Sequence, residues 1–174
     1  FGITDVHVHV DGPEVPIGGG DALHWVEVLK DAGRKEMPCE VKMALVSEPL
    51  KVQNESTGAY AIALPSDRLC VHYTFKHERS FIGEQFFFCD SLREAFVKEI
   101  APARTFGFIE EVEQLRSLGL GKGGSLQNCV LVFSDGYSTS LRFKDELVRH
   151  KVLDLLGDIA LLGVELVARI EVYM

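Results

Sequence analysis

The sequence, 174 residues long, lacks the marks of several common protein classes. It has no run rich in lysine or arginine and a formal net charge of −8, which argues against nucleic acid as its main partner. Its four cysteines form no C-x-x-C pair, which argues against a zinc ribbon or a thioredoxin-like redox site. Because nothing else indicates secretion, we expect reduced thiols and a cytoplasmic protein.

A long apolar run is also absent. The longest apolar stretch, residues 152–170, is interrupted by Asp154, Asp158 and Glu165, and such charges are costly inside a bilayer. The first ten residues have neither the basic start nor the apolar run of a signal peptide. We therefore expect no membrane span, and without an amphipathic seam we expect a monomer. Since the chain starts without methionine and ends within a strand pattern, we expect a fragment.

What remains is a globular composition, with 47% hydrophobic and 25% charged residues, enough to build a core. The spacing of the apolar residues divides the chain into strands and helices. Strands are predicted at residues 6–10, 41–50, 60–64, 69–75, 86–88, 129–133, 141–143 and 167–173, and helices at 22–32, 91–100, 106–118 and 144–163. Asp135-Gly136 predicts a hairpin turn before residues 141–143. This pattern is α+β with mostly antiparallel strands, and its character changes near residue 88.

The helix predicted at residues 144–163 carries a histidine and a carboxylate four positions apart, His150 and Asp154. At this spacing both side chains project from one face of a helix, and an imidazole nitrogen and a carboxylate oxygen can bind one zinc ion. Lys151 flanks the pair, and Asp158 lies one turn further on. The same pattern fits a solvated polar face, and spacing alone does not decide between the two interpretations.

Two further segments are candidates for ligand contacts. Residues 103–108, Ala-Arg-Thr-Phe-Gly-Phe, fit either a substrate-holding loop or a proline-assisted linker between helices. The glycine-rich residues 119–125 match neither common phosphate-binding glycine motif, and we interpret them as a flexible lip beside a pocket or a plain turn. Five other histidines have no carboxylate partner at fixed spacing, and we interpret them as surface or strand-face residues: His7, His9, His24, His72 and His77.

Taken together, these segments resemble the UDP-3-O-acyl-N-acetylglucosamine deacetylases, zinc enzymes that commit sugar nucleotides to lipid A synthesis. Residues 103–108, 119–128 and 148–158 occur in this order in that family, and the last segment, VRHKVLDLLGD, contains the helical pair. Residues 11–17, DGPEVPI, resemble an early strand and turn of the same family. Four motifs in order extend the resemblance over essentially the whole chain.

The resemblance implies two similar small α+β domains, residues 1–88 and 89–174. Each is expected to be a mostly antiparallel sheet layered with helices, with the active site between the domains. A β-α-β insert in the second domain, from about residue 108 to residue 133, is expected to form a passage for the substrate's acyl chain. The resemblance assigns substrate contact to Phe106 and places four residues near the passage: Val112, Gly124, Ser125 and Leu131.

The same resemblance implies zinc-dependent hydrolysis of the N-acetyl group of an acylated UDP-sugar, with release of acetate. His150 and Asp154 match two of the family's three zinc ligands. Lys151 and Thr105 match groups that stabilise the oxyanion, and Asp158 matches the carboxylate that orients a catalytic histidine.

The family's third zinc ligand, its general base and its catalytic histidine have no match in this sequence. The first two precede the segment that matches residues 1–3, and the histidine follows the segment that matches residues 171–174. We therefore expect little or no turnover from this chain alone. The alternatives are a catalytically incomplete fragment and a non-catalytic module that binds acyl sugar nucleotides. An unrelated α+β scaffold requires all four motifs to be coincidence.

Overall fold

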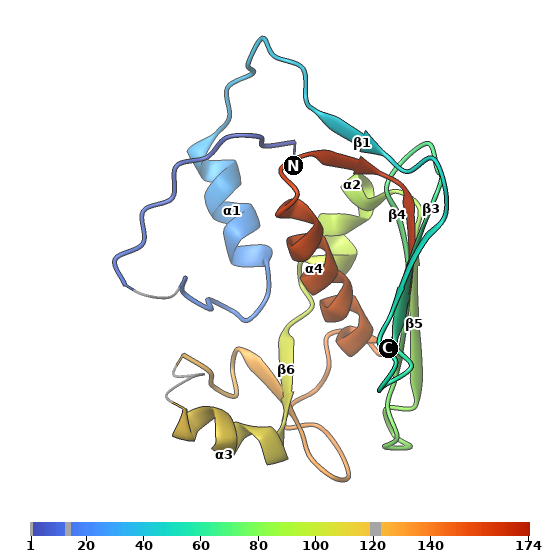
Figure 1. Ribbon diagram of the computed structural model, residues 1–174. Helices are drawn as coiled ribbons and strands as arrows, with labels where there is room; N and C mark the ends of the chain where they lie inside the picture. The colour runs from blue at the N-terminus through green and yellow to red at the C-terminus, as the bar shows by residue number, and fades with distance from the viewer. Residues whose placement is uncertain (1, 13–14, 119–122) are drawn as a thin grey trace.

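The computed structural model describes residues 2–12, 15–118 and 123–174, and its largest element is a five-stranded sheet (Figure 1). The strand order is β2-β3-β9-β4-β5. Every neighbouring pair in this sheet is antiparallel except β4 with β9, which confirms the predicted α+β class. The strands are β2 (Leu50–Gln53), β3 (Tyr60–Leu64), β4 (Cys70–Lys76), β5 (Glu84–Cys89) and β9 (Arg169–Tyr173).

Helices cover one face of this sheet (Figure 1). α4 (Glu146–Ala160) packs on β4 and β5, next to α2 (Leu92–Ala95) and its continuation as the π-helix η1 (Phe96–Ile100). α1 (Leu23–Ala32) lies on the side of α4 away from the sheet. None of the helices in the described part of the chain is both long and apolar enough to cross a bilayer.

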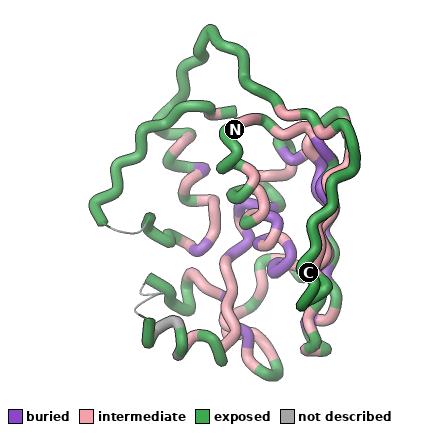
Figure 2. Tube along the Cα trace, viewed as in Figure 1, coloured by how far each residue is buried: buried purple, intermediate pink, exposed green. Residues whose placement is uncertain are grey.

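Buried residues concentrate on α4 and on the neighbouring strands of the main sheet (Figure 2). The inward positions of β4 and β5 alternate with exposed ones, as a strand with one covered face requires. Apolar side chains of α4 complete the same core, which includes Val71, Phe87, Leu147, Val148 and Val152. This packing fixes the rotation of α4 about its own axis. The polar stripe of His150, Lys151, Asp154 and Asp158 therefore lies on the side of the helix away from the core.

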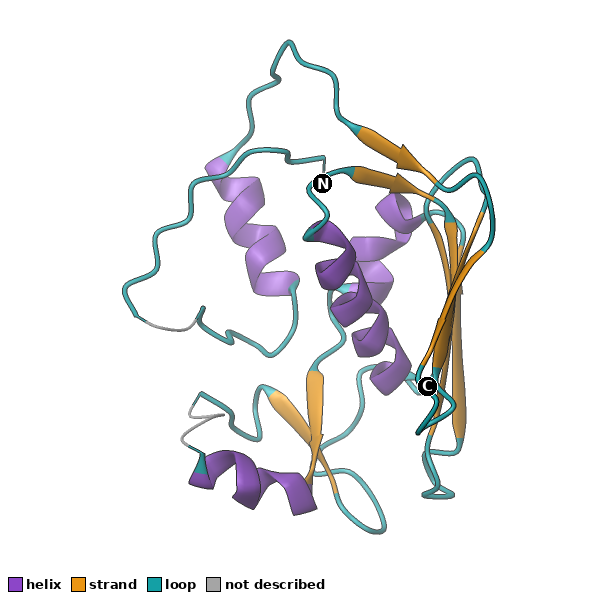
Figure 3. Ribbon diagram, viewed as in Figure 1, coloured by secondary structure: helices purple, strands orange, loops and turns teal. Residues whose placement is uncertain are grey.

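Two smaller sheets flank the main one. β1 (Met43–Leu45) pairs in parallel with β8 (Glu165–Val167). β6 (Thr105–Phe108) pairs in parallel with β7 (Cys129–Val132), and α3 (Ile109–Ser117) lies between them in the chain. This β-α-β unit, which the family resemblance predicted, extends from one end of α4 (Figure 3).

The position of β9 bears on the domain organisation. β9 lies between β3 and β4, so the main sheet combines strands from both sides of residue 88. The division into residues 1–88 and 89–174 stays a prediction.

Three predicted elements were wrong. Residues 6–10 are not a strand, and their valines are exposed, because no strand in the described ranges pairs with them. Residues 106–108 belong to β6 instead of a helix, because they pair with β7. Residues 141–143 do not complete a hairpin: the return from Asp135-Gly136 reaches only a single bridge between Val132 and Tyr137.

A buried ion pair joins the start of α4 to the start of β6. Glu146 is fully buried and Arg104 is 6% exposed. Glu146 Oε1 accepts hydrogen bonds from Arg104 N at 3.0 Å and Nε at 2.9 Å. Its Oε2 accepts from Arg104 Nη2 at 3.2 Å and from the backbone N–H of Arg142 at 2.6 Å. The last of these bonds explains why the Arg142 N–H is not free to pair in a hairpin.

The environment of Glu146 favours its ionised form. Burial by itself would raise the pKa of the Glu146 carboxyl group. Hydrogen bonds from Arg104 and Arg142, together with the charge of Arg104, outweigh this effect and hold the pKa below its ordinary value. The carboxylate therefore stays charged at neutral pH.

Acid should weaken this ion pair. Because the folded-state pKa of Glu146 lies below the ordinary value of 4.5, its stabilisation is complete above about pH 4.5 and is lost as pH falls through the lower folded-state pKa. We expect Glu146→Gln to lower the free energy of unfolding in urea by ~3–5 kcal/mol near neutral pH. The difference from the wild type should shrink below about pH 4.5.

The control for this prediction is Asp145→Asn, which changes the preceding carboxylate. Oδ1 of Asp145 lies 2.7 Å from Nε of Arg149, and the Asp145 side chain is 29% exposed. We therefore expect Asp145→Asn to lower the free energy of unfolding by under ~1 kcal/mol. A Glu146→Gln difference that stays constant between about pH 6 and pH 3 would contradict the linkage argument.

Candidate functional site

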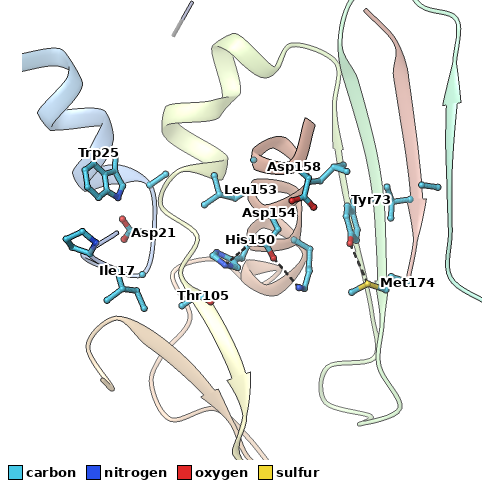
Figure 4. Close-up of a pocket in the computed structure, with 18 residues that line it drawn as sticks. Ile17, Asp21, Trp25, Tyr73, Thr105, His150, Leu153, Asp154, Asp158 and Met174 are labelled. Atoms are coloured by element: carbon cyan, nitrogen blue, oxygen red, sulfur yellow. Dashed lines mark hydrogen bonds and ion pairs between the residues drawn. The ribbon is translucent and has the colours of Figure 1, made fainter. Parts of the chain in front are cut away.

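A cleft of about 910 Å³ runs along the polar side of α4. It is lined by all five residues predicted to act in metal binding or catalysis: Thr105, His150, Lys151, Asp154 and Asp158. β6 supplies Thr105 and α4 supplies the other four. Figure 4 shows Thr105 on β6 and His150, Asp154 and Asp158 on α4 along the same cleft. The fold therefore brings Thr105 into the same cleft as four residues of α4 that lie far from it in the chain.

The hydrogen bonds of His150 determine which ring nitrogen faces the cleft. Its side chain is largely buried, and Nδ1 lies 3.0 Å from the carbonyl oxygen of Ala103. A carbonyl oxygen can only accept, so Nδ1 carries the proton. In the neutral ring Nε2 then presents its lone pair, and it lies 3.4 Å from Oδ1 of Asp154. Two acceptor atoms at this distance favour a cation between them, either a proton or a metal ion.

Lys151 brings a positive charge to the rim of the same cleft. Its Nζ lies 3.1 Å from Oδ2 of Asp154 and 5.4 Å from the ring centroid of Phe106. The carboxylate and the aromatic face together restrict the ammonium group to this position. Asp158, one turn after Asp154, is exposed at the far end of the same stripe.

The wall opposite α4 comes from the turn before α1 and from the first turn of α1 itself. Ile17, Asp21 and Trp25 face His150 and Asp154 across the cleft in Figure 4. The turn is fastened to β6 by a hydrogen bond from Thr105 N to Gly20 O at 2.6 Å. Asp21 forms an ion pair with Arg142. These contacts hold the turn beside Thr105, whose side chain lines the cleft.

Tyr73 of β4 also lines the cleft, and the sequence analysis missed it. Burial raises the pKa of its hydroxyl group to about 12, with a smaller contribution from the charge of Asp154. The hydroxyl therefore stays protonated, and its nearest partner is Sδ of Met174 at 3.9 Å. Strand alternation marks Tyr73 only as inward-facing, and nothing in the sequence indicates that α4 leaves its hydroxyl next to a cleft.

The residues that the resemblance assigns to substrate contact or to the acyl passage do not line this cleft. Phe106 lies on β6, Val112 on α3, and Leu131 on β7, while Gly124 and Ser125 are exposed in the preceding loop. Substrate contact by Phe106 and a position of the other four residues near an acyl passage stay predictions. Part of that glycine-rich segment, residues 119–122, and Pro13 and Glu14 of the early motif lie outside the described residues.

Comparison with known proteins identifies the family of the chain. The LpxC family model, UDP-3-O-acyl N-acetylglycosamine deacetylase, matches residues 1–174. The chain belongs to this family. The resemblance predicted from the four sequence motifs is thereby confirmed, and three of those motifs supply residues to the cleft: residues 11–17, 103–108 and 148–158.

Individual family members show how much of a deacetylase the chain covers. A UDP-3-O-acyl-N-acetylglucosamine deacetylase of Campylobacter fetus is 38% identical over 175 residues, which is 99% of this chain and 59% of the relative. One of Oleidesulfovibrio alaskensis is 41% identical over 177 residues, which is 98% of this chain and 56% of the relative. The chain therefore spans somewhat more than half the length of these curated relatives.

The turn that forms the cleft wall should depend on Gly20. Its φ is +72°, and a Cβ there would overlap the carbonyl oxygen of Asn128. We expect Gly20→Ala to lower the free energy of unfolding by ~3 kcal/mol or more. The strain of an alanine in the left-handed backbone region adds to the cost of the overlap between its Cβ and the Asn128 backbone. Gly18→Ala is the matched control: its φ is +56°, but its Cβ would lie 3.6 Å from His24, so only the strain of ~1–2 kcal/mol applies. Equal losses for both variants in urea unfolding would refute the close approach.

Proposed function

We propose that the complete protein hydrolyses the N-acetyl group of UDP-3-O-acyl-N-acetylglucosamine and releases acetate, the committed step of lipid A biosynthesis. In this proposal the chain supplies two ligands of a catalytic zinc ion and the groups that face the reacting amide. The observation that carries it is the arrangement of His150 and Asp154. Membership of the family and the relatives' names support the reaction assigned.

The two candidate ligands fit zinc in kind and in spacing. An imidazole nitrogen and a carboxylate oxygen are both common zinc ligands, with bond lengths of about 2.0–2.2 Å. Tetrahedral coordination at those lengths places two donor atoms ~3.4 Å apart. The distance from His150 Nε2 to Asp154 Oδ1 is 3.4 Å. The lone pair of Nε2 and the carboxylate thus already have the separation of two ligands of one ion.

A catalytic zinc site usually has three protein ligands. Within the described ranges, no group of three or more His, Cys, Asp or Glu residues gathers in a way that could hold a metal ion. The curated relatives are longer than this chain. We therefore propose that a further segment of the complete protein supplies the third ligand, together with the general base and the catalytic histidine.

The remaining side chains fit the roles that the family resemblance assigns. A bound zinc ion would supply Lewis-acid activation of the attacking water and the acetamide carbonyl. The Lys151 ammonium group and the Thr105 hydroxyl lie on the cleft wall, where they can stabilise the negative charge that develops on the carbonyl oxygen. Asp158 can accept a hydrogen bond from the histidine that protonates the leaving amine, and so fix that histidine's orientation.

The proposal also covers the setting of the enzyme. All four cysteines are free thiols in the structure, and two of them, Cys70 and Cys89, are buried. Free thiols suit a reducing compartment, so we propose a cytoplasmic, monomeric enzyme acting on an acylated UDP-sugar.

Zinc content should show which ligands this chain supplies. After mild chelation we expect the purified 174-residue chain to retain well under one zinc per chain, because two ligands hold the ion weakly. Titration of zinc into the chelated chain should give weak binding that His150→Ala and Asp154→Ala each lower by about tenfold or more. One tightly held zinc that is lost in Asp154→Ala would mean that the third ligand lies within this chain.

Activity of the complete protein tests the reaction itself. We expect Lys151→Met to lower kcat for acetate release by about 10²–10³-fold, because it removes one group facing the oxyanion. Lys144→Met is the control, since Lys144 is exposed just before α4, and it should stay within about twofold of the wild type. Equal activity of both variants would refute the role of Lys151. Binding of the acyl sugar nucleotide without any acetate release would favour the non-catalytic module.

A further inference from the structure

One peptide unit is held from both ends by two side chains of α4. The carbonyl group of Ala103 accepts the hydrogen bond from His150 Nδ1 at 3.0 Å, and the N–H of Arg104, in the same peptide plane, donates to Glu146 Oε1 at 3.0 Å. Glu146 and His150 are four residues apart on the helix, so both side chains project toward the same segment. The result is a continuous chain of hydrogen bonds from the Glu146 carboxylate to the His150 ring.

From this geometry we propose that Glu146 is a positioning residue for the metal-binding nitrogen of His150. It acts through the Ala103–Arg104 peptide, and it fixes the ring as the tautomer with hydrogen on Nδ1 and a lone pair on Nε2. The inference rests on the proposed function in one respect, which is that His150 Nε2 is the nitrogen that binds the metal ion.

The physical basis is polarisation along the hydrogen-bond chain. A negative charge at the N–H end of a peptide shifts electron density toward its carbonyl oxygen, which becomes a stronger acceptor. A stronger acceptor at Nδ1–H fixes the tautomer and raises the basicity of Nε2. In many metal sites a carboxylate bonds directly to the distal nitrogen of a ligating histidine. Here the carboxylate acts one peptide further away.

The surroundings favour such an effect. Glu146 and Ala103 are 0% exposed, Arg104 is 6% exposed and His150 is 8% exposed. Little water can therefore compete for these hydrogen bonds or screen the charge. Arg104 and Arg142 supply the other donors to the carboxylate, which hold it ionised and in one orientation.

A merely structural role for Glu146 makes a different prediction. Holding α4 against β6 affects stability, whereas polarisation of the peptide affects the proton position on His150. The tautomer of His150 is therefore the measurement that separates the two roles. It needs neither metal nor substrate, so its outcome is independent of whether the complete protein is a deacetylase.

The experiment uses the 174-residue chain with ¹⁵N-labelled histidine at about pH 9, where an ordinary imidazole is neutral. Long-range ¹H–¹⁵N correlation spectra report which ring nitrogen carries the proton, and a His150→Gln spectrum identifies the signals of His150 among the six histidines. We expect the wild type to show hydrogen on Nδ1. In Glu146→Gln the ratio of the Nδ1–H to the Nε2–H form should fall about tenfold, the factor that a net ~1.4 kcal/mol corresponds to.

Asp145→Asn is the matched control, because it neutralises the neighbouring carboxylate without touching the peptide. It should keep the wild-type tautomer. If Glu146→Gln does not give the amide spectrum of a folded protein, Glu146→Asp is used in its place. The aspartate keeps a negative charge beside Arg104, but its shorter side chain does not reach the peptide N–H equally well. We expect the same fall in the ratio of the Nδ1–H to the Nε2–H form. Hydrogen on Nε2 in the wild type, or an unchanged ratio in a folded Glu146 variant, would overturn the proposal.

Discussion

The position of the candidate site depends on one buried carboxylate. Glu146 begins α4 and accepts all its hydrogen bonds from Arg104 and Arg142. An ionised group without such partners would be too costly to bury, so the segment that carries Arg104 must lie against the start of α4. Thr105, the residue after Arg104, lines the cleft. Ala103, the residue before it, accepts a hydrogen bond from His150. The buried contact between Glu146 and Arg104 thereby sets the distance between the two elements that supply the site, β6 and α4.

The cleft itself is a consequence of how α4 is packed. The apolar side of the helix is occupied by the core over β4 and β5, which leaves the stripe of His150, Lys151, Asp154 and Asp158 facing outward. The turn before α1 closes the opposite side through the backbone of Gly20. Of these four residues His150 is largely buried and Lys151 is half-buried, whereas Asp154 and Asp158 are exposed. Of the two interpretations of the helical pair, a metal-binding site and a solvated polar face, the functional one stays a prediction.

Several elements could be predicted because their signals are local. The strands at residues 60–64 and 69–75 and the helices at residues 22–32 and 144–163 have clear apolar periodicity, and each is present within a few residues. The strand at residues 6–10 has an equally clear pattern but is not formed, since a strand requires a partner and the described residues provide none. β6 was taken for the start of a helix because its four residues are too few to distinguish the two periods. At residues 141–143, a side-chain carboxylate binds the backbone N–H of Arg142, and no propensity scale reports that competition.

The sequence by itself determined the α4 stripe. A helix repeats every 3.6 residues, so His150, Asp154 and Asp158 share a face wherever the helix is placed. It also determined the family, because the motifs are short contiguous segments. Only the tertiary structure decided that the Ala103–Arg104 peptide meets both Glu146 and His150, that β9 enters the sheet between β3 and β4, and that Tyr73 and the turn before α1 line the cleft. These are contacts between distant segments, fixed by the packing of the whole core and the burial of Glu146, and no local pattern encodes them.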